Sequence, residues 1–92
     1  MKYRIMLSPD ALLHLEEWRH SGQVQVLRKL ASLFEELETH PMSGTGKPER
    51  LRGELRGYWS RRITKADRMI YKIDGTEILV SIVSLKGHYG EK

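Results

Sequence analysis

Side chains that could carry out acid–base chemistry on a phosphate are concentrated in the second half of this chain. Residues 46–73 read GKPERLRGELRGYWSRRITKADRMIYKI, and a histidine and a tyrosine follow at positions 88 and 89. A carboxylate can accept a proton, an imidazole can donate one near neutral pH, and a guanidinium can hold a phosphate through paired hydrogen bonds. These are the groups needed to cleave RNA by attack of its own 2′-hydroxyl without a metal ion.

Three residues fit the separate roles in that reaction. Glu49 is the candidate base, because the neighbouring cations favour its ionised form. His88 is the candidate acid, and Arg68, at the start of a predicted strand, is the candidate phosphate ligand. Ordinary alternatives are a solvated glutamate on a basic loop and a histidine in a C-terminal tail, and position alone favours the solvated reading of Glu49.

A predicted strand at residues 58–64 decides between two consecutive arginines. Arg61 and Arg62 must point to opposite faces, because side chains alternate along a strand. Trp59 shares the face of Arg61 and looks core-facing, so Arg62 is the better site candidate. Tyr58 on the face of Arg62, and Tyr89 near the terminus, could stack on bases. The alternative is an edge strand protected by charge.

Length and composition narrow the class of protein. Ninety-two residues predict one domain, residues 1–92, and a net charge of +4 favours a polyanionic partner. The absence of cysteine excludes disulfides and thiolate metal sites and fits a reducing cytoplasm. His14, His20 and His40 lack metal-ligand spacing, so we expect them to be structural or solvated. We also expect no signal peptide, no membrane segment and no cofactor.

Helix signals dominate the first half of the chain. A short strand at 2–7 precedes a helix that is expected to start with Ser8 as its cap and Pro9 in its first turn. Ser21-Gly22 should end it. A second helix is expected at 23–38, ended by Pro41. The predicted core residues of the two helices are Leu12, Leu15, Trp18, Leu27, Leu30, Ala31, Phe34 and Leu37.

Strand signals dominate the second half. Strands are expected near 50–52, at 58–64, at 68–73 and at 77–85, with a hairpin at Asp74-Gly75 between the last two. The last strand is the most apolar and is expected to be central in the sheet. The predicted fold class is therefore α+β, with an N-terminal strand and a helical hairpin packed on a small antiparallel sheet. The uncovered sheet face would carry the arginines.

The motif GKPExLxxxLxGYWSRRITxxxRxIY at 46–71, with His88-Tyr89, resembles the YoeB (Txe) family of the RelE/ParE toxin superfamily. The resemblance covers almost the whole chain and implies a RelE-like two-layer fold. It also implies a toxin of a bacterial type II toxin–antitoxin pair that enters the ribosomal A site and cuts mRNA. No metal or cofactor is expected for that activity.

The resemblance assigns roles by position. Glu49 matches the general base, His88 the general acid, Arg68 the arginine that stabilises the transition state, and Tyr89 the tyrosine that positions the substrate. Arg62 matches a second arginine at the phosphate. We expect RNA binding by Arg62, Arg52 and Lys47. Two features depart from the family pattern: the tail Gly90-Glu91-Lys92, and Lys86-Gly87 before the histidine.

Implied partners are a cognate antitoxin, whose C-terminal segment would fold over the basic face, and the ribosome with its mRNA. The resemblance also implies a homodimer. Two other functions remain open. A gyrase-inhibiting toxin like those of the ParE branch would lack the set of Glu49, Arg68 and His88. A non-catalytic RNA-binding module would keep its function after Glu49→Ala.

Overall fold

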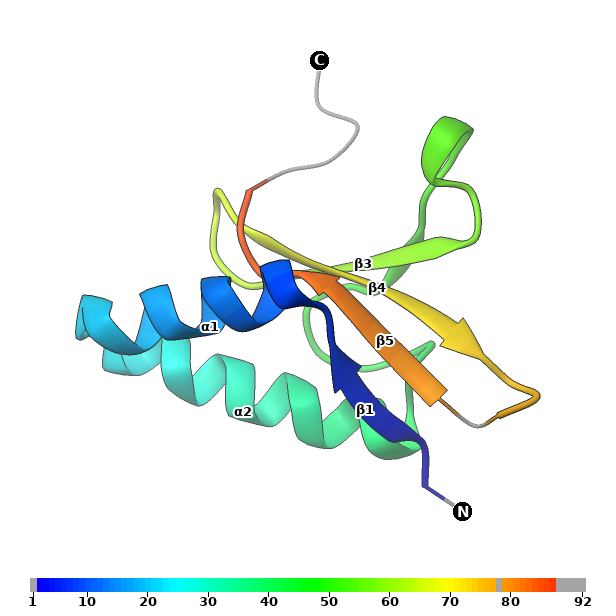
Figure 1. The fold of residues 1–92 in the computed structure, drawn as a ribbon, viewed down its shortest axis with the longest axis horizontal. Coiled ribbons are helices and arrows are strands. Elements are labelled where there is room, and N and C mark those ends of the chain that lie inside the picture. The colour runs from blue at the N-terminus through cyan, green and yellow to red at the C-terminus, as the bar shows by residue number, and fades with distance from the viewer. Residues whose placement is uncertain (1, 78, 88–92) are drawn as a thin grey trace.

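The computed structural model describes residues 2–77 and 79–87, and its elements follow the predicted order. Strand β1 is followed by two helices and then by four further strands, with a short 3₁₀ turn between the first two of them (Figure 1). Their bounds are β1 Arg4–Leu7, α1 Pro9–Ser21, α2 Val24–Thr39, β2 Glu49–Arg50, η1 Gly53–Leu55, β3 Tyr58–Arg62, β4 Arg68–Asp74 and β5 Leu79–Ser84. None of the described helices is long and apolar enough to cross a membrane.

The strands form one sheet in the order β1-β5-β4-β3-β2, so the predicted α+β fold class is confirmed. Strands β2 to β5 pair as the expected antiparallel meander. The structure adds a parallel pairing of β1 with β5, which makes the sheet mixed. The two helices serve as the crossover that a parallel pair requires. The central strand is β4 rather than the predicted β5, because the added pairing with β1 leaves β5 second from the edge.

Local chemistry sets the ends of α1. The Ser8 hydroxyl accepts a hydrogen bond from the Ala11 amide at 3.0 Å, and it donates one to the Val83 carbonyl at 2.8 Å. The cap therefore also ties the start of the helix to β5. Gly22 ends α1 with a φ of 74°, a left-handed conformation that glycine adopts without steric cost.

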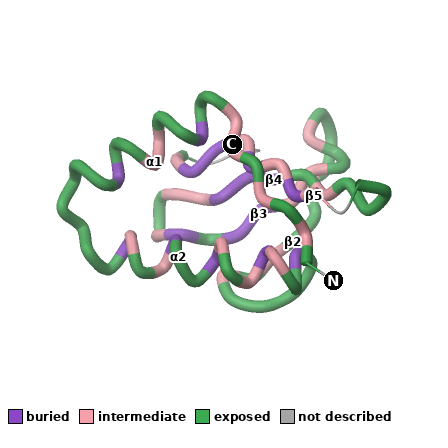
Figure 2. Tube along the Cα trace, turned by 60° about the horizontal axis from the view of Figure 1, so that its bottom comes forward, coloured by how far each residue is buried: buried purple, intermediate pink, exposed green. Residues whose placement is uncertain are grey.

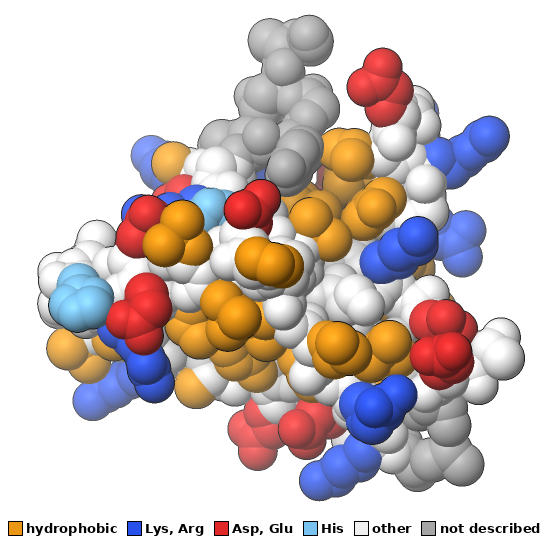
Figure 3. Space-filling model, viewed as in Figure 1, with side chains coloured by type: hydrophobic (Ala, Val, Ile, Leu, Met, Phe, Trp, Pro, Cys, Tyr) orange, Lys and Arg blue, Asp and Glu red, His pale blue; other side chains and the backbone are white. Residues whose placement is uncertain are grey.

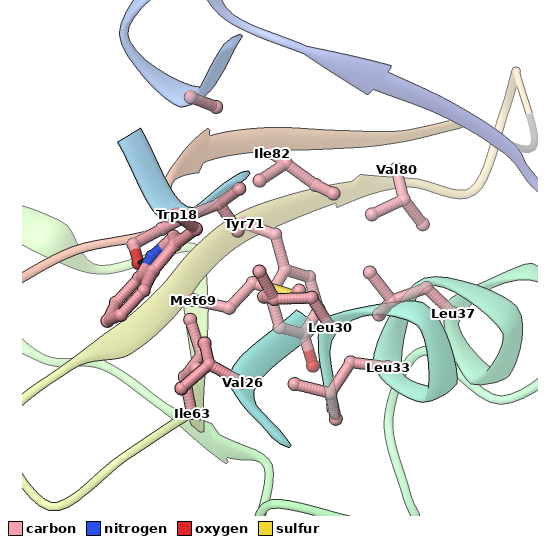
Figure 4. Close-up of a cluster of buried hydrophobic side chains, with 12 residues drawn as sticks. Trp18, Val26, Leu30, Leu33, Leu37, Ile63, Met69, Tyr71, Val80 and Ile82 are labelled. Carbon is pink, nitrogen blue, oxygen red and sulfur yellow. Dashed lines mark hydrogen bonds between the residues drawn. The ribbon is translucent and has the colours of Figure 1, made fainter. Parts of the chain in front are cut away.

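Both helices cover one face of the sheet, and the core lies between the layers (Figures 2 and 4). Side chains from α1 and α2 meet those of β4 and β5 there. The helical members are Ala11, Trp18, Val26, Leu30, Leu33 and Leu37; the others are Ile63, Met69, Tyr71, Val80, Ile82 and Leu85. Trp18 also donates from its indole nitrogen to the Leu85 carbonyl at 3.0 Å. The buried tryptophan thus keeps its polar atom satisfied.

Parts of the predicted helical stripe were wrong. In α1, Leu12 is exposed and Ala11 is buried instead. In α2, Ala31 is exposed, whereas Val26 and Leu33 join the core. Positions 26, 30, 33 and 37 repeat at the same helical spacing as the predicted stripe, so the apolar face is rotated rather than absent. Leu27 and Phe34 flank it and are half-buried.

A buried arginine joins the sheet to the loop that follows α2. The side chain of Arg61 is fully buried, and its Nη1 lies 2.8 Å from Oε1 of Glu36 in α2. The guanidinium also donates to the backbone carbonyls of His40, Ser43 and Thr45. We call these contacts, with those of Tyr71 below, the Arg61 network. Every donor nitrogen of this guanidinium has a partner, which offsets the cost of burying its charge.

Tyr71 completes the Arg61 network from β4. Its hydroxyl accepts from Nε of Arg61 at 3.1 Å and donates to the Pro41 carbonyl at 2.7 Å. Burial raises the pKa of Tyr71 above its ordinary value of 10.0, so the hydroxyl keeps the proton that it donates. The loop between α2 and β2 is therefore held from both β3 and β4.

We expect the stability of the folded chain to fall in acid partly through Glu36. The pKa of Glu36 lies below its usual 4.5, because its carboxylate accepts hydrogen bonds from Thr45 and from Arg61 and these outweigh the effect of burial. A lowered folded-state pKa stabilises the fold above the unfolded-state value, and that stability is lost as the pH falls through the folded-state value.

Urea unfolding from about pH 6 down to about pH 3 measures this loss. The Glu36→Gln variant should lose less free energy of unfolding over that range than the unmodified chain. Glu35→Gln is the matched control, since Glu35 is the preceding residue of α2 and is exposed. Equal acid sensitivity of the Glu36 variant and the control would contradict the assignment.

Candidate active site

The sheet face opposite the helices brings three predicted site residues together. Glu49 in β2 lies directly across from Ser60 in β3, and Arg62 in β3 lies across from Arg68 in β4. Directly opposed residues of antiparallel strands place their side chains on the same face. Ser60 and Arg62 are two apart in β3, so all four share one face. The structure thus gathers the predicted base and both predicted phosphate-binding arginines.

The floor of this face is closely packed. Ile70 of β4 lies opposite Ser60 on one side and Ser84 of β5 on the other. Ile70, Ser60 and Ser84 are all buried, yet Ile70 is not part of the core cluster between the layers. These three buried side chains therefore form the floor beneath the charged side chains of this face.

Arg68 is anchored rather than free in solvent. Its side chain is half-buried, and Nη1 donates to the Ser60 hydroxyl at 2.8 Å. Its backbone amide donates to the Gly87 carbonyl at 3.0 Å. One guanidinium nitrogen is thus fixed by the sheet, which orients the remaining donors for an anion.

The segment that leads to the predicted acid is held beside Arg68. The Gly87 amide donates to Oδ1 of Asp67 at 2.9 Å, while Oδ2 of the same carboxylate accepts from the Thr64 hydroxyl at 2.8 Å. Together with the bond from the Arg68 amide, this fixes the residue that directly precedes His88. His88 and Tyr89 lie outside the described residues, so their roles stay predictions.

Glu49 stands on an edge strand. The observed strand β2 covers residues 49–50, one residue earlier than the predicted strand at 50–52, so Glu49 belongs to the sheet itself. Its side chain is exposed, and pairing with β3 fixes its backbone. The predicted loop glutamate is therefore a strand residue with a defined direction.

Lys47 and Arg52 flank β2 at its two ends, and both are exposed. Lys47 follows Gly46, whose carbonyl accepts from the Arg62 amide at 2.7 Å. A Cβ added at Gly46 would lie 3.0 Å from the Arg62 carbonyl oxygen, at a φ of 85°, so the close approach and the conformation both favour glycine. Among the described residues, no hydrogen bond or ion pair joins Lys47 or Arg52 to Glu49, Arg62 or Arg68.

The arginine and aromatic side chains of β3 divide between its two faces. Arg61 and Arg62 do point to opposite faces, and Arg61 is the buried one, as expected. Trp59 is half-buried and packs against the core. Tyr58 is half-buried, with the Lys72 ammonium 5.3 Å from its ring centroid. Ser60 and Asp67 were not predicted as site residues, although the alternation along β3 places Ser60 on the face of Arg62.

The remaining histidines behave as predicted. Nδ1 of His14 accepts from the Leu85 amide at 3.1 Å, which is a structural role. His20 and His40 are exposed. Within the described ranges, no three His, Asp or Glu side chains lie close enough to share a metal ion.

Comparison with known proteins gives the family. A family model described as "YoeB-like toxin of bacterial type II toxin-antitoxin system" matches residues 7–89. The chain belongs to the YoeB family. It is 36% identical over 85 residues to a protein named toxin YoeB from Mycobacterium bovis, an alignment that covers 92% of this chain and 96% of the relative. Toxin YoeB of Escherichia coli K12 is 32% identical over 72 residues, covering 78% and 82%.

Solved structures agree with that assignment. A YoeB/ParE toxin from Agrobacterium tumefaciens superposes with a TM-score of 0.86 at 29% identity, covering 94% of this chain and 99% of that one. A YoeB dimer from Staphylococcus aureus gives 0.82 at 30% identity, covering 97% and 100%. A YoeB–YefM complex from the same organism gives 0.80, with the same identity and coverage. This YoeB-family chain is therefore the toxin of a bacterial type II toxin–antitoxin system.

Proposed function

We propose that this toxin is a ribosome-dependent mRNA endonuclease that uses metal-independent acid–base catalysis. The observation that supports it best is the gathering of Glu49, Arg62 and Arg68 on one open sheet face, with Gly87 held beside Arg68. We take residues 1–92 as one toxin domain. Because the proposed activity takes place on the ribosome, we propose that the toxin acts in the cytoplasm.

The reaction uses each group once. The Glu49 carboxylate accepts the proton of the 2′-hydroxyl, and the 2′-oxygen then attacks the adjacent phosphorus in line with the leaving 5′-oxygen. The guanidiniums of Arg62 and Arg68 compensate the charge that develops on the phosphoryl oxygens. His88 donates a proton to the departing 5′-oxygen, and Tyr89 positions the substrate. The products are a 2′,3′-cyclic phosphate and a 5′-hydroxyl.

The anchoring of Arg68 supports this division of roles. Electrostatic stabilisation is effective when donors are already oriented before charge develops. The bond from Arg68 to Ser60 provides that orientation, and the two bonds to Gly87 bring the chain toward the same phosphate. Inhibition of gyrase does not require a carboxylate beside two arginines. On a surface that only binds RNA, the negative charge of Glu49 would weaken the binding.

Partners follow from the relatives. Since a YoeB of Staphylococcus aureus is described in complex with YefM and another as a dimer, we propose a cognate antitoxin and a homodimer for this chain as well. The basic sheet face is the surface that an antitoxin segment would cover to block access of mRNA. Free RNA should be cut only weakly, because the ribosome supplies the path and the codon geometry.

Primer extension on a translated reporter mRNA tests the function. Induction of the chain should produce new 5′ ends inside codons. These ends should disappear when the start codon of the reporter is removed, and also in a Glu49→Ala/His88→Ala variant. Intact mRNA in growth-arrested cells would refute the nuclease and favour a target such as gyrase. Cleavage that persists in the double variant would remove both residues from the mechanism.

A further inference from the structure

A small hollow lies where the chain turns from β2 into β3, beside the proposed catalytic face. It has a volume of about 230 Å³ and is lined by Arg50, Leu51, Arg56, Gly57, Tyr58 and Trp59. Pockets for drug-sized ligands measure roughly 300–1,000 Å³, so this hollow suits one planar ring rather than a larger molecule. In Figure 3, orange and blue side chains lie next to one another at the upper right, where Figure 1 places this connection.

Two planar groups lie next to each other at the hollow. Arg50 and Trp59 face each other across β2 and β3, and the Arg50 guanidinium lies 5.4 Å from the centroid of the indole. Trp59 packs against the core and is half-buried. Unpaired bases stack on both aromatic rings and guanidinium planes, so this pair offers a base a surface of either kind.

The charges at the hollow suit a polyanion. Arg50 and Arg56 are both exposed, and neither takes part in any of the ion pairs found among the described residues. Within the part of the chain that the structure describes, no carboxylate pairs with either guanidinium, so both can contact a phosphate. Gly57, which directly follows Arg56, has a φ of 98°, so the turn from Arg56 into β3 depends on glycine.

The hollow is one residue away from the proposed base. Glu49 and Arg50 are consecutive in β2, and their side chains point to opposite faces of the sheet. Strand β2 is the last strand of the sheet on this side. An RNA strand whose phosphate lies at Glu49 can therefore pass over this edge and reach the Arg50–Trp59 pair.

We propose that this hollow is a subsite for an unpaired nucleotide that flanks the cleaved phosphate in the substrate RNA. Its base stacks on the Arg50–Trp59 pair, and its phosphate contacts Arg56. This proposal rests on the proposed function, because it extends the same substrate strand beyond Glu49.

A 2′-O-methyl hexa-adenosine probe tests the subsite independently of cleavage, since it has no 2′-hydroxyl to attack. In ¹H–¹⁵N spectra of the full chain, the indole resonance of Trp59 should shift on titration. The indole of Trp18, buried and bonded to Leu85, is an internal control and should stay in place. A Trp59→Phe variant assigns the two signals.

Fluorescence anisotropy with the same probe measures the role of the arginines. An Arg50→Gln/Arg56→Gln variant should bind about fivefold to 100-fold more weakly than an Arg4→Gln/Arg28→Gln variant, the range expected when one stacked base is lost. Both variants lose the same charge, and the second pair is exposed on β1 and α2. An unmoved Trp59 resonance at saturation, or equal affinities of the two variants, would overturn the subsite. If the Trp59 resonance shifts and the Arg50/Arg56 variant binds more weakly, but the chain leaves mRNA intact, the subsite would stand and the proposed nuclease activity would be refuted.

Discussion

Replacing Arg68 by alanine should lower the rate of ribosome-dependent mRNA cleavage by about 10²–10³-fold, the usual effect of removing one preorganised donor to developing charge. The guanidinium is held by Ser60 at 2.8 Å, and its backbone pairs with Gly87. The guanidinium of Arg68 is therefore already oriented when the phosphate binds. Its loss should slow the chemical step more than it weakens binding of the ribosome.

The measurement is single-turnover cleavage of mRNA on purified, programmed ribosomes. Arg28→Ala is the matched control, because it removes the same charge from an exposed position in α2. Arg68→Lys adds a second comparison: it keeps the charge but loses the planar fork, and should fall between the other two. An Arg68→Ala chain that cuts at the rate of the Arg28 control would remove Arg68 from the mechanism.

Replacing Arg61 by methionine should reduce the free energy of unfolding by about 3 kcal/mol or more, because each buried acceptor that loses its donor costs about 1–3 kcal/mol. Methionine fills part of the space but donates no hydrogen bond. The Glu36 carboxylate and the carbonyls of His40, Ser43 and Thr45 would lose their shared partner. For a small domain this is a large part of a total of about 5–15 kcal/mol.

Urea unfolding followed by circular dichroism measures the effect. Arg62→Met is the matched control, because Arg62 is the next residue in β3, has the same charge as Arg61 and is exposed. Its free energy of unfolding should change by no more than about 0.5 kcal/mol. Faster hydrogen exchange at the Thr45 amide, which is bonded to Glu36, should accompany the loss in the Arg61 variant. Equal stability of the two variants would contradict the structural role of Arg61.

The sequence predicted best the features that are set by a few neighbouring residues. Ser8, Pro9 and Gly22 mark the ends of α1 through their own backbone chemistry, and alternation in β3 correctly separated Arg61 from Arg62. The parallel pairing of β1 with β5 depends on how the helices pack, and no local pattern encodes it. The rotated face of α2 has the same origin, because Leu27 and Val26 are equally apolar and only tertiary contacts choose between them.

The candidate site shows the same division. Residue types made Glu49 and Arg68 candidates, and alternation along the predicted strand selected Arg62. The register of three strands was needed to place all three on one face. The partners of Arg61 are mostly backbone carbonyls, which have no signature in a sequence. The bond between Asp67 and Gly87 joins residues twenty positions apart and was equally hidden.

Because side chains alternate along β3, substitutions at Arg61 and at Arg62 should inactivate the toxin in different ways. In cells forced to survive induction of this toxin, changes at Arg61 should be recovered as chains that are degraded before they act. Changes at Arg62 should be recovered as folded, abundant and harmless chains. A folded Arg62 variant would still bind the antitoxin. In a cell that also carries an intact copy, the variant would therefore leave more of the intact toxin uninhibited. A degraded Arg61 variant would have no such effect.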